Sequence, residues 1–299
     1  MFDGFSAVSV ETDETTIFVR MGGAGPAVLL LHGFPETHVM WRDVAPVLAR
    51  SFTVVCADLR GYGRSGCPAS TTDHAPYSKR TMGRDMVAVM GQLGFDRFAL
   101  VGHDRGARVA YRLALDHPER IERLAVLDIV PTEAAWARAN SEFAVSYWPW
   151  IMLAQDEPLP ERFMTAAPEA IIDNALGGWG SPASVFPASV RALYAGALRE
   201  YEHAYAICEE YRAAASLDRE HDRADVENGR RIACPTLALW SAKGPLSTWY
   251  AAEGGPIELW KPWCDDVRGH AVDGGHFFPE EVPGETARLL RDFLAEPNG

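Results

Sequence analysis

The stretch Phe98-Ala-Leu-Val-Gly-His-Asp-Arg-Gly-Ala-Arg108 decides the fold, together with Val109-Ala-Tyr-Arg-Leu-Ala-Leu-Asp116 after it. It begins as an apolar run typical of a buried strand, and the segment that follows has the spacing of a helix. Gly102 and Gly106 flank the turn between the two, which leaves Asp104 as the residue that the turn presents. A strained strand–turn–helix with small residues on both sides is the nucleophile elbow of the α/β-hydrolase fold.

A carboxylate at this elbow, where a serine is usual, changes the chemistry. Attack by Asp104 on an acyl group would form a reactive anhydride. Attack on a saturated carbon that carries a leaving group forms an ordinary ester, which water can cleave afterwards. The sequence therefore predicts displacement at saturated carbon, and the competing interpretation is a Gly-x-Asp-x-Gly turn without a catalytic role.

Composition favours one globular enzyme in a reduced compartment. The chain has 299 residues, of which 47% are hydrophobic, and its five cysteines show no metal-ligand spacing. No apolar run has the length of a membrane span, and the first residues lack the pattern of a signal peptide, so we expect a cytoplasmic protein. The net charge of −13 argues against nucleic-acid binding, and any anionic substrate must be held by a local cluster of cations.

Strands and helices alternate along most of the chain, which predicts a mostly parallel sheet. We expect a hairpin over 5–20, strands at 27–31, 53–57, 124–128 and 235–240, a helix over 77–93 and a C-terminal helix over 285–294. A last strand is expected near either 257–260 or 267–272. Between 132 and 231 the alternation stops, which indicates a helical cap inserted into a core made of 1–131 and 232–299.

Two loops are expected at the carboxyl ends of strands, where open α/β sheets bind ligands. His32-Gly-Phe-Pro35 places the backbone N–H of Phe34 beside that of Arg105, and the two predict an oxyanion hole. His276, in the glycine-rich loop Asp273-Gly-Gly-His276, is the best candidate for the base, because the chain order of this fold is nucleophile, acid, histidine. His103 is interpreted as a packing or hydrogen-bonding residue of the turn.

The acid that orients the base is a choice among several aspartates. Its commonest place is the loop after the strand ending at Trp240, but the segment 241–247 has no carboxylate. Asp128, at the carboxyl end of the preceding strand, is therefore preferred. Weaker candidates, which no local pattern places at a strand end, are Asp265, Asp266 and Asp273.

Arg105 and Arg108 are three residues apart, so they share a face of the helix that begins at the elbow. Cations near a helix N-terminus cost up to ~1 kcal/mol each, and a buried arginine needs an anion. A substrate carboxylate held by a fork of two arginines would supply that anion.

The sequence resembles the haloacetate dehalogenases, including fluoroacetate dehalogenase, of the α/β-hydrolase superfamily. Nearly the whole chain carries the resemblance, in the segments His-Gly-Phe-Pro at 32–35, Gly-His-Asp-Arg-Gly-Ala-Arg at 102–108, Leu-Asp-Ile-Val-Pro at 127–131, Tyr-Arg-Ala-Ala-Ala at 211–215 and Asp-Gly-Gly-His-Phe-Phe-Pro-Glu-Glu at 273–281. The resemblance implies that Asp104 is the nucleophile, His276 the base and Asp128 its partner.

The resemblance also implies that Arg105 and Arg108 bind the substrate carboxylate and that Trp150 and Tyr211 bind the halide, with Trp179 as a further candidate for the pocket. It implies a homodimer that acts on a small anionic 2-halo acid with no cofactor and no metal.

The chain departs from this family at one position of the cap. The family commonly reads Tyr-Trp-His-Trp, where the histidine helps to hold the halide, whereas this chain reads Tyr147-Trp-Pro-Trp150. We therefore expect turnover of chloroacetate and bromoacetate, with fluoroacetate as a poorer substrate.

Two other functions stay open at this point. An epoxide hydrolase would use the same Asp104, His276 and Asp128, with Tyr147 and Tyr211 protonating the opened ring. A binding protein with a hydrolase fold and no turnover is the alternative from a different class.

Overall fold

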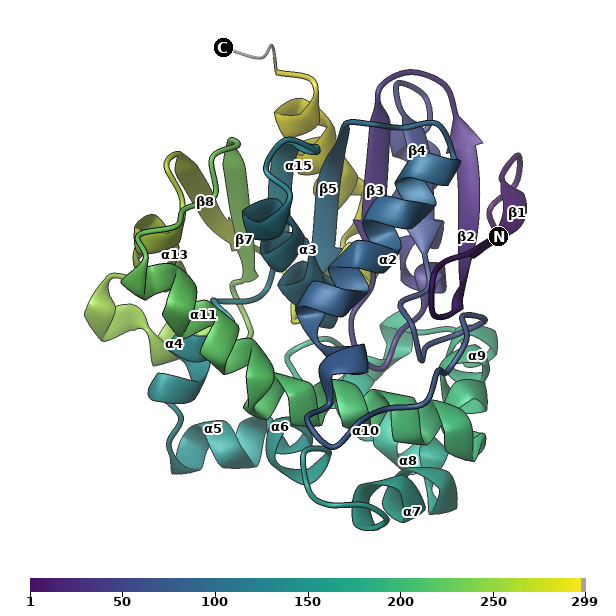
Figure 1. Ribbon diagram of the computed structural model, residues 1–299, viewed down its shortest axis with the longest axis vertical. Coiled ribbons are helices and arrows are strands. Elements are labelled where there is room, and N and C mark those ends of the chain that lie inside the picture. The colour runs from purple at the N-terminus through teal and green to yellow at the C-terminus, as the bar shows by residue number, and fades with distance from the viewer. Residues whose placement is uncertain (297–299) are drawn as a thin grey trace.

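An eight-stranded sheet forms the centre of the computed structural model, which describes residues 1–296 (Figure 1). The strand order is β1-β2-β4-β3-β5-β6-β7-β8; β1 and β2 form an antiparallel hairpin, β2 pairs antiparallel with β4, and all other pairs are parallel. The strands are β1 Ser6–Glu11, β2 Thr16–Gly23, β3 Ala27–Leu31, β4 Thr53–Ala57, β5 Phe98–His103, β6 Ile121–Leu127, β7 Thr236–Ser241 and β8 Val267–Val272.

The structure decides between the two segments proposed for the last strand. Residues 267–272 form β8, whereas Pro256–Trp260 is the short helix α13. Pro256 explains the second result, since proline suits the first turn of a helix and cannot donate to a strand ladder. The hairpin and the other strands form where the sequence predicts them, and the C-terminal helix begins two residues earlier than expected, at Pro283.

Helices cover both faces of the sheet, because β3, β4 and β5 are apolar on both sides. In β3, Leu29 and Leu31 pack in the core under α2 and α3, and Val28 and Leu30 pack in the core on the opposite face, with α1 and α15. These core helices are α1 Ala45–Leu48, α2 Lys79–Gln92, α3 Asp104–Asp116, α12 Leu246–Trp249, α13, α14 Phe278–Glu281 and α15 Pro283–Leu294. Short 3-10 helices lie at His38–Arg42, Ala75–Tyr77, Ala251–Glu253 and Lys261–Trp263.

A helical insertion, residues 132–231, joins β6 to β7, and every regular element in it is a helix. Helices α5 to α10 lie below the sheet in Figure 1. The members are α4 Thr132–Ala137, α5 Ser141–Ser146, α6 Trp148–Met152, α7 Leu159–Ala166, α8 Pro168–Gly178, a 3-10 helix Ala183–Val185, α9 Ala188–Arg199, α10 Tyr201–Ala215 and α11 Leu217–Glu227. Of the helices within residues 1–296, none is both long and apolar enough to cross a membrane.

Candidate active site

The elbow between β5 and α3 holds Asp104 in a left-handed conformation, with φ of +42°. The two flanking positions must be glycine, because a Cβ at either one would clash with neighbouring backbone atoms. A Cβ on Gly102 would lie 2.5 Å from the backbone of Ala107, and a Cβ on Gly106 would lie 2.4 Å from the carbonyl oxygen of His32. The strain at Asp104 is therefore held by close packing of neighbouring backbone, as a nucleophile elbow requires.

The Asp104 carboxylate is buried and ionised. Its Oδ2 accepts a hydrogen bond of 3.1 Å from the backbone N–H of Phe34, in the loop after β3. Burial by itself would raise the pKa of Asp104, but the charges of His276, Arg105 and Arg108 outweigh it and lower that pKa. The N–H of Phe34 thus lies where the sequence places one oxyanion donor, and the matching role of the Arg105 N–H stays a prediction.

Asp128 and His276, 148 residues apart in the chain, meet beside the elbow. The Nδ1 of His276 donates to Oδ2 of Asp128 at 2.6 Å, and both side chains are buried. The other oxygen, Oδ1, accepts from the backbone N–H of Ser241 at 2.7 Å. Asp128 has a φ of +54°. From the end of β6 its carboxylate thus reaches Ser241, the last residue of β7, next to the loop in which the sequence has no acid.

The second ring nitrogen of His276 is free to act as a base. Within residues 1–296 no group hydrogen-bonds to its Nε2, which is buried. The backbone N–H of His276 donates to the carbonyl of Trp179 at 2.8 Å, and the Trp179 ring meets the imidazole edge to face at 5.3 Å. Because Asp128 accepts from Nδ1–H, the neutral ring has its lone pair on Nε2.

The two arginines of α3 differ in their partners. Arg108 donates from Nη1 to the Val130 carbonyl and to Oγ1 of Thr132, both at 3.1 Å. No carboxylate of residues 1–296 forms an ion pair with it, and its Nε has no partner there. Burial, and then the charge of Arg105, lower the pKa of Arg108. Arg108 is thus a buried cation that still needs an anion.

Arg105 already has an anion, Glu210 of α10 in the helical insertion. Its Nε donates to the two Glu210 carboxylate oxygens at 2.8 and 2.9 Å, and Nη2 donates to one of them as well. Lys79 and Tyr62 also bind this carboxylate, and the Arg105 and Glu210 side chains are fully buried. Arg105 thus has a protein anion whereas Arg108 forms no ion pair within the described chain, and the binding of a substrate carboxylate by the two arginines stays a prediction. Arg105 keeps only a buried Nη1 without a partner in residues 1–296.

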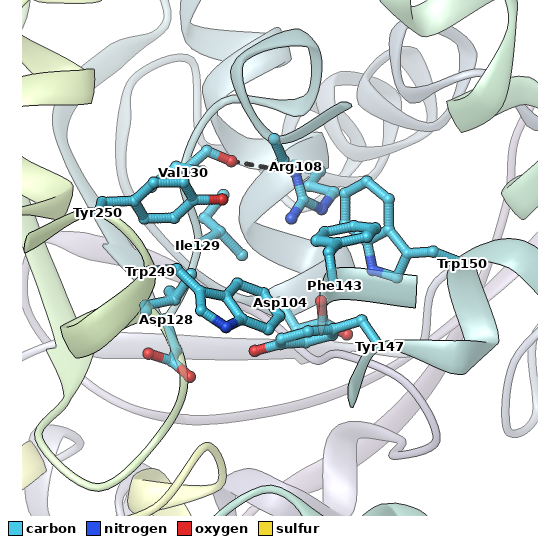
Figure 2. Close-up of a pocket in the computed structure, with 12 residues that line it drawn as sticks. Asp104, Arg108, Asp128, Ile129, Val130, Phe143, Tyr147, Trp150, Trp249 and Tyr250 are labelled. Atoms are coloured by element: carbon cyan, nitrogen blue, oxygen red, sulfur yellow. Dashed lines mark hydrogen bonds between the residues drawn. The ribbon is translucent and has the colours of Figure 1, made fainter. Parts of the chain in front are cut away.

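Asp104, Asp128 and Arg108 line one small cavity together (Figure 2). The volume open to the centre of a water molecule is about 20 Å³, and one water needs about 10–15 Å³ on that measure. The cavity therefore suits a ligand of very few atoms. Its lining is mostly apolar and comprises Asp104, Arg108, Asp128, Ile129, Val130, Ala135, Phe143, Tyr147, Trp150, Leu246, Trp249 and Tyr250.

The aromatic residues that the resemblance assigns to the halide lie in different positions. Trp150 lines the cavity, with its ring centroid 4.4 Å from the Arg108 guanidinium carbon. Tyr211 lies outside this lining; its ring stacks on the Arg105 guanidinium at 4.0 Å and meets Phe34 edge to face at 5.7 Å. Trp179 contacts the base, as described above, and its Nε1 donates to the Ser146 carbonyl.

His103 directly precedes Asp104 and faces two hydrogen-bond acceptors. Its Nδ1 lies 3.0 Å from Oε2 of Glu36 and its Nε2 lies 2.8 Å from the carbonyl oxygen of His276, so both nitrogens face acceptors and both must carry hydrogen. Burial opposes this charge, but Glu36 and then Asp104 outweigh it and raise the pKa of His103 to about 9. His103 thus ties the loop after β3, the elbow and the base loop together.

The buried acid Glu280 completes this network. It binds Arg42, and the Tyr194 hydroxyl donates to it at 3.2 Å. Burial, and then the neighbouring Glu36 carboxylate, raise the pKa of Glu280 well above its usual range. The raised pKa favours the neutral form of Glu280, which adds no negative charge beside Glu36.

Comparison with known proteins agrees with this geometry. The sequence model described as alpha/beta hydrolase fold matches residues 26–282. A fluoroacetate dehalogenase of Burkholderia sp is 42% identical over 99% of this chain and 96% of its own. The chain belongs to the haloacetate dehalogenase family of α/β hydrolases.

A solved structure and a more distantly related enzyme are also similar to this chain. An α/β hydrolase structure from Nostoc sp PCC 7120 is 44% identical, with a TM-score of 0.94 over 99% of this chain and 100% of that one. A soluble epoxide hydrolase of Corynebacterium sp. (strain C12) is 29% identical over 91% of each chain. Of these two enzymes, the fluoroacetate dehalogenase is more similar to this chain than the soluble epoxide hydrolase.

Several residues of this dehalogenase-family site were missed in the sequence. Glu36 directly follows the His32-Gly-Phe-Pro35 motif, and Glu210 directly precedes Tyr211, so an acid next to a motif was the available signal. Phe143, Trp249 and Tyr250 line the cavity with no motif around them. Aromatic residues in helices are most often core residues, and only the fold shows that these three face a cavity.

Proposed function

We propose that the protein is a hydrolytic dehalogenase that converts haloacetates to glycolate and halide. The observation that carries the proposal is the meeting of three groups: an ionised Asp104 at the elbow, a His276 with a free Nε2 held by Asp128, and the anion-free Arg108. A carboxylate nucleophile beside a base and a cation fits displacement on a small anion.

The reaction has two covalent steps. In the first, an Asp104 oxygen bonds to the α-carbon while the carbon–halogen bond breaks, and the halide leaves with the electron pair. In the second, water loses a proton to Nε2 of His276 and attacks the ester carbonyl, whose developing negative oxygen the N–H of Phe34 stabilises. The bond from that carbonyl carbon to the ester oxygen, which came from Asp104 in the first step, then breaks and this oxygen leaves with glycolate, taking the proton from His276. The second proton of the water is lost from the new carboxylic acid to solvent, which restores the Asp104 carboxylate.

The substrate is proposed to be small and anionic. A cavity of about 20 Å³ leaves little room beyond a two-carbon acid. Arg108 is the main receptor for its carboxylate, because it lines the cavity and forms no ion pair with a carboxylate of residues 1–296, and Arg105 contributes Nη1, its one guanidinium nitrogen without a partner there. The chain's net charge of −13 makes such a local receptor necessary.

Halide binding is proposed for Trp150, which lines the cavity, with Tyr211 behind it. Pro149 has no side-chain donor, so one hydrogen bond to the departing halide is missing relative to the family's usual histidine. Fluoride is the poorest leaving group and gains most from such bonds. Chloroacetate and bromoacetate are therefore the proposed preferred substrates.

Halide release and isotope labelling test this proposal. Purified protein given chloroacetate should release chloride, and Asp104→Asn should release none. In a single turnover in oxygen-18 water, the label should enter the Asp104 carboxylate, because water attacks the aspartyl carbonyl. Label found in glycolate instead would contradict the covalent route, and no halide from any haloacetate would favour a binding protein without turnover.

Epoxide hydrolysis is the second candidate, and one observation favours it. The buried hydroxyl of Tyr147 lines the cavity wall and has no hydrogen-bond partner among residues 1–296. Such a hydroxyl can protonate the oxygen of an opening epoxide. Faster turnover of a small neutral epoxide, such as ethylene oxide, than of chloroacetate would favour this candidate.

The proposal also covers the role of the helical insertion, the cellular location and the oligomeric state. We expect residues 132–231 to act as the cap that closes the site, and the protein to be a cytoplasmic homodimer. Support for the cap is the position of Tyr147 and Trp150 in the cavity lining. Support for the dimer is the resemblance to the family, and light scattering on the purified protein measures it directly.

A further inference from the structure

A second cavity lies against the active-site cavity and shares one side with it. Its volume is about 260 Å³ on the measure that gives about 20 Å³ for the active-site cavity. Both cavities are lined by the same three side chains, Phe143, Trp249 and Tyr250. These three aromatic residues, called the partition below, separate a very small reaction chamber from a roomy neighbour.

The partition is made by both parts of the chain. Phe143 comes from α5 in the helical insertion, and Trp249 and Tyr250 come from the end of α12 in the core. Phe143 meets Trp249 at 5.5 Å between ring centroids, and Tyr147 meets Trp249 at 5.0 Å. Trp249 thus stands at the junction where the insertion closes on the core.

Trp249 is the member of the partition that is most easily removed. It is half-buried, whereas Phe143 and Tyr250 are 5% and 3% exposed. No group of the described chain accepts a hydrogen bond from its Nε1. Truncation of Trp249 therefore breaks no hydrogen bond of the protein and removes mainly ring contacts.

The second cavity suits an uncharged substituent. On its outer side Arg138 binds Glu253 through both carboxylate oxygens, at 2.7 to 2.9 Å, and Glu142 adds a further negative charge. One cation against two anions does not favour a second carboxylate. The inner side is the aromatic partition, which an alkyl chain can contact.

We infer that Trp249 determines the substrate size: its indole closes the active-site cavity against the second cavity and so restricts the enzyme to two-carbon acids. Without it the two cavities join, and the alkyl group of a longer 2-halo acid gains space beside the reacting carbon. This inference rests on the proposed function, because it concerns the same nucleophile and the same reaction.

The test compares two substrates in two proteins. For wild type and Trp249→Ala, kcat/KM is measured by halide release from chloroacetate and from racemic 2-chlorobutanoate. Comparing the ratio of the two values between the two proteins cancels the lower intrinsic reactivity of the secondary carbon. We expect Trp249→Ala to raise the ratio in favour of 2-chlorobutanoate by at least about tenfold, since a single methylene is worth about 10- to 200-fold in such a pocket.

Two further variants separate size selection from general damage. Trp148→Ala removes an indole that lines neither cavity and hydrogen-bonds Asn174, and it should leave the ratio unchanged. Glu142→Trp added to Trp249→Ala refills the second cavity, and it should return the ratio toward the wild-type value.

The possible outcomes distinguish a failure of this inference from a failure of the proposed function. An unchanged ratio in a folded Trp249→Ala that still hydrolyses chloroacetate overturns the inference alone. A wild type that releases no chloride from chloroacetate overturns the proposed function and the inference with it. If Trp249→Ala does not fold, Phe143→Leu opens the partition from its other side, and the same rise in the ratio is expected there.

Discussion

The two walls of the active-site cavity are built in different ways. The core wall (Asp104 and Asp128, with His276 bonded to Asp128) is held by backbone hydrogen bonds, from Phe34 to Asp104 and from Ser241 to Asp128. The insertion wall (Phe143, Tyr147 and Trp150) is held by ring contacts, such as 5.2 Å between Phe143 and Trp150.

Because of this difference, we expect catalysis to depend on the core wall and substrate selectivity to depend on the insertion wall. Backbone hydrogen bonds at strand ends fix reacting atoms closely, because the sheet itself sets their positions. Ring contacts are non-directional and tolerate repacking, so the insertion wall can change its shape without displacing the nucleophile. Changes in the core wall should therefore abolish turnover, and changes in the insertion wall should redirect it.

The largest effect is expected from the core wall itself. Asp104→Asn and His276→Ala should each lower kcat by at least about four decades, the size seen when a member of a catalytic triad is removed. His276→Ala should also accumulate the aspartyl ester, because the second step loses its base. Intact-protein mass spectrometry after mixing with chloroacetate detects that adduct, and its absence in an active His276→Ala would contradict the assignment of the base.

The next largest effect is expected from substitutions of Arg105 and Arg108. Arg108→Lys should lower kcat/KM for chloroacetate by about two to three decades, because a buried charge pair loses its planar geometry. Arg105→Lys should lower kcat/KM less, since two guanidinium nitrogens of Arg105, Nε and Nη2, already donate to Glu210. Steady-state kinetics on both variants measure this order.

Two results would contradict the proposal that Arg108 is the main receptor for the substrate carboxylate. A larger loss for Arg105→Lys would mean that Arg105, and not Arg108, is the main carboxylate receptor. Efficient turnover of 1-chlorobutane by the wild type would show that no carboxylate receptor is needed.

A smaller effect, on stability, is expected from the network behind the core wall. The folded pKa of His103 is about 9, against an ordinary value of 6.5. Because the folded value is raised, the stabilisation is fully present below about pH 6.5 and is lost as pH rises through 9. The free energy of unfolding should fall by up to about 3 kcal/mol across that window.

The His103→Asn variant provides the control for this pH dependence. Urea unfolding of wild type and His103→Asn at intervals from pH 6 to pH 10 isolates the contribution of the histidine, since all other groups are shared. Parallel curves for the two proteins over this range would show that His103 is not protonated in the folded state.

The smallest effect is expected from the insertion wall, at Pro149. Fluoroacetate turnover should be slower than chloroacetate turnover in the wild type, because one donor to the departing fluoride is missing. Pro149→His should raise kcat/KM for fluoroacetate by about tenfold, less than the two to three decades of a fully preorganised donor, because the new ring must fit a buried helix start. Chloroacetate serves as the matched control, with little change expected.

Much of the core could be predicted from the sequence because its signals are local. The run from Phe98 to Arg108 contains strand, turn and helix within eleven residues, so the elbow follows from neighbours along the chain. Asp128 was found by elimination, since the segment after Trp240 has no carboxylate, and its bond to His276 agrees with that reasoning. The strand at 267–272 needed the structure, because 257–260 has a similar apolar content.

The sequence alone was enough to predict the fold and to propose Asp104, His276 and Asp128 as nucleophile, base and acid, since backbone sterics and the order of elements along the chain set where these residues lie. Only the tertiary structure decided which arginine is available to a substrate, because Glu210 is 105 residues from Arg105 and no local pattern brings them together. It also decided how large the cavity is. Size depends on how Phe143 of the insertion meets Trp249 of the core, and such contacts between distant side chains form only when the insertion packs on the sheet.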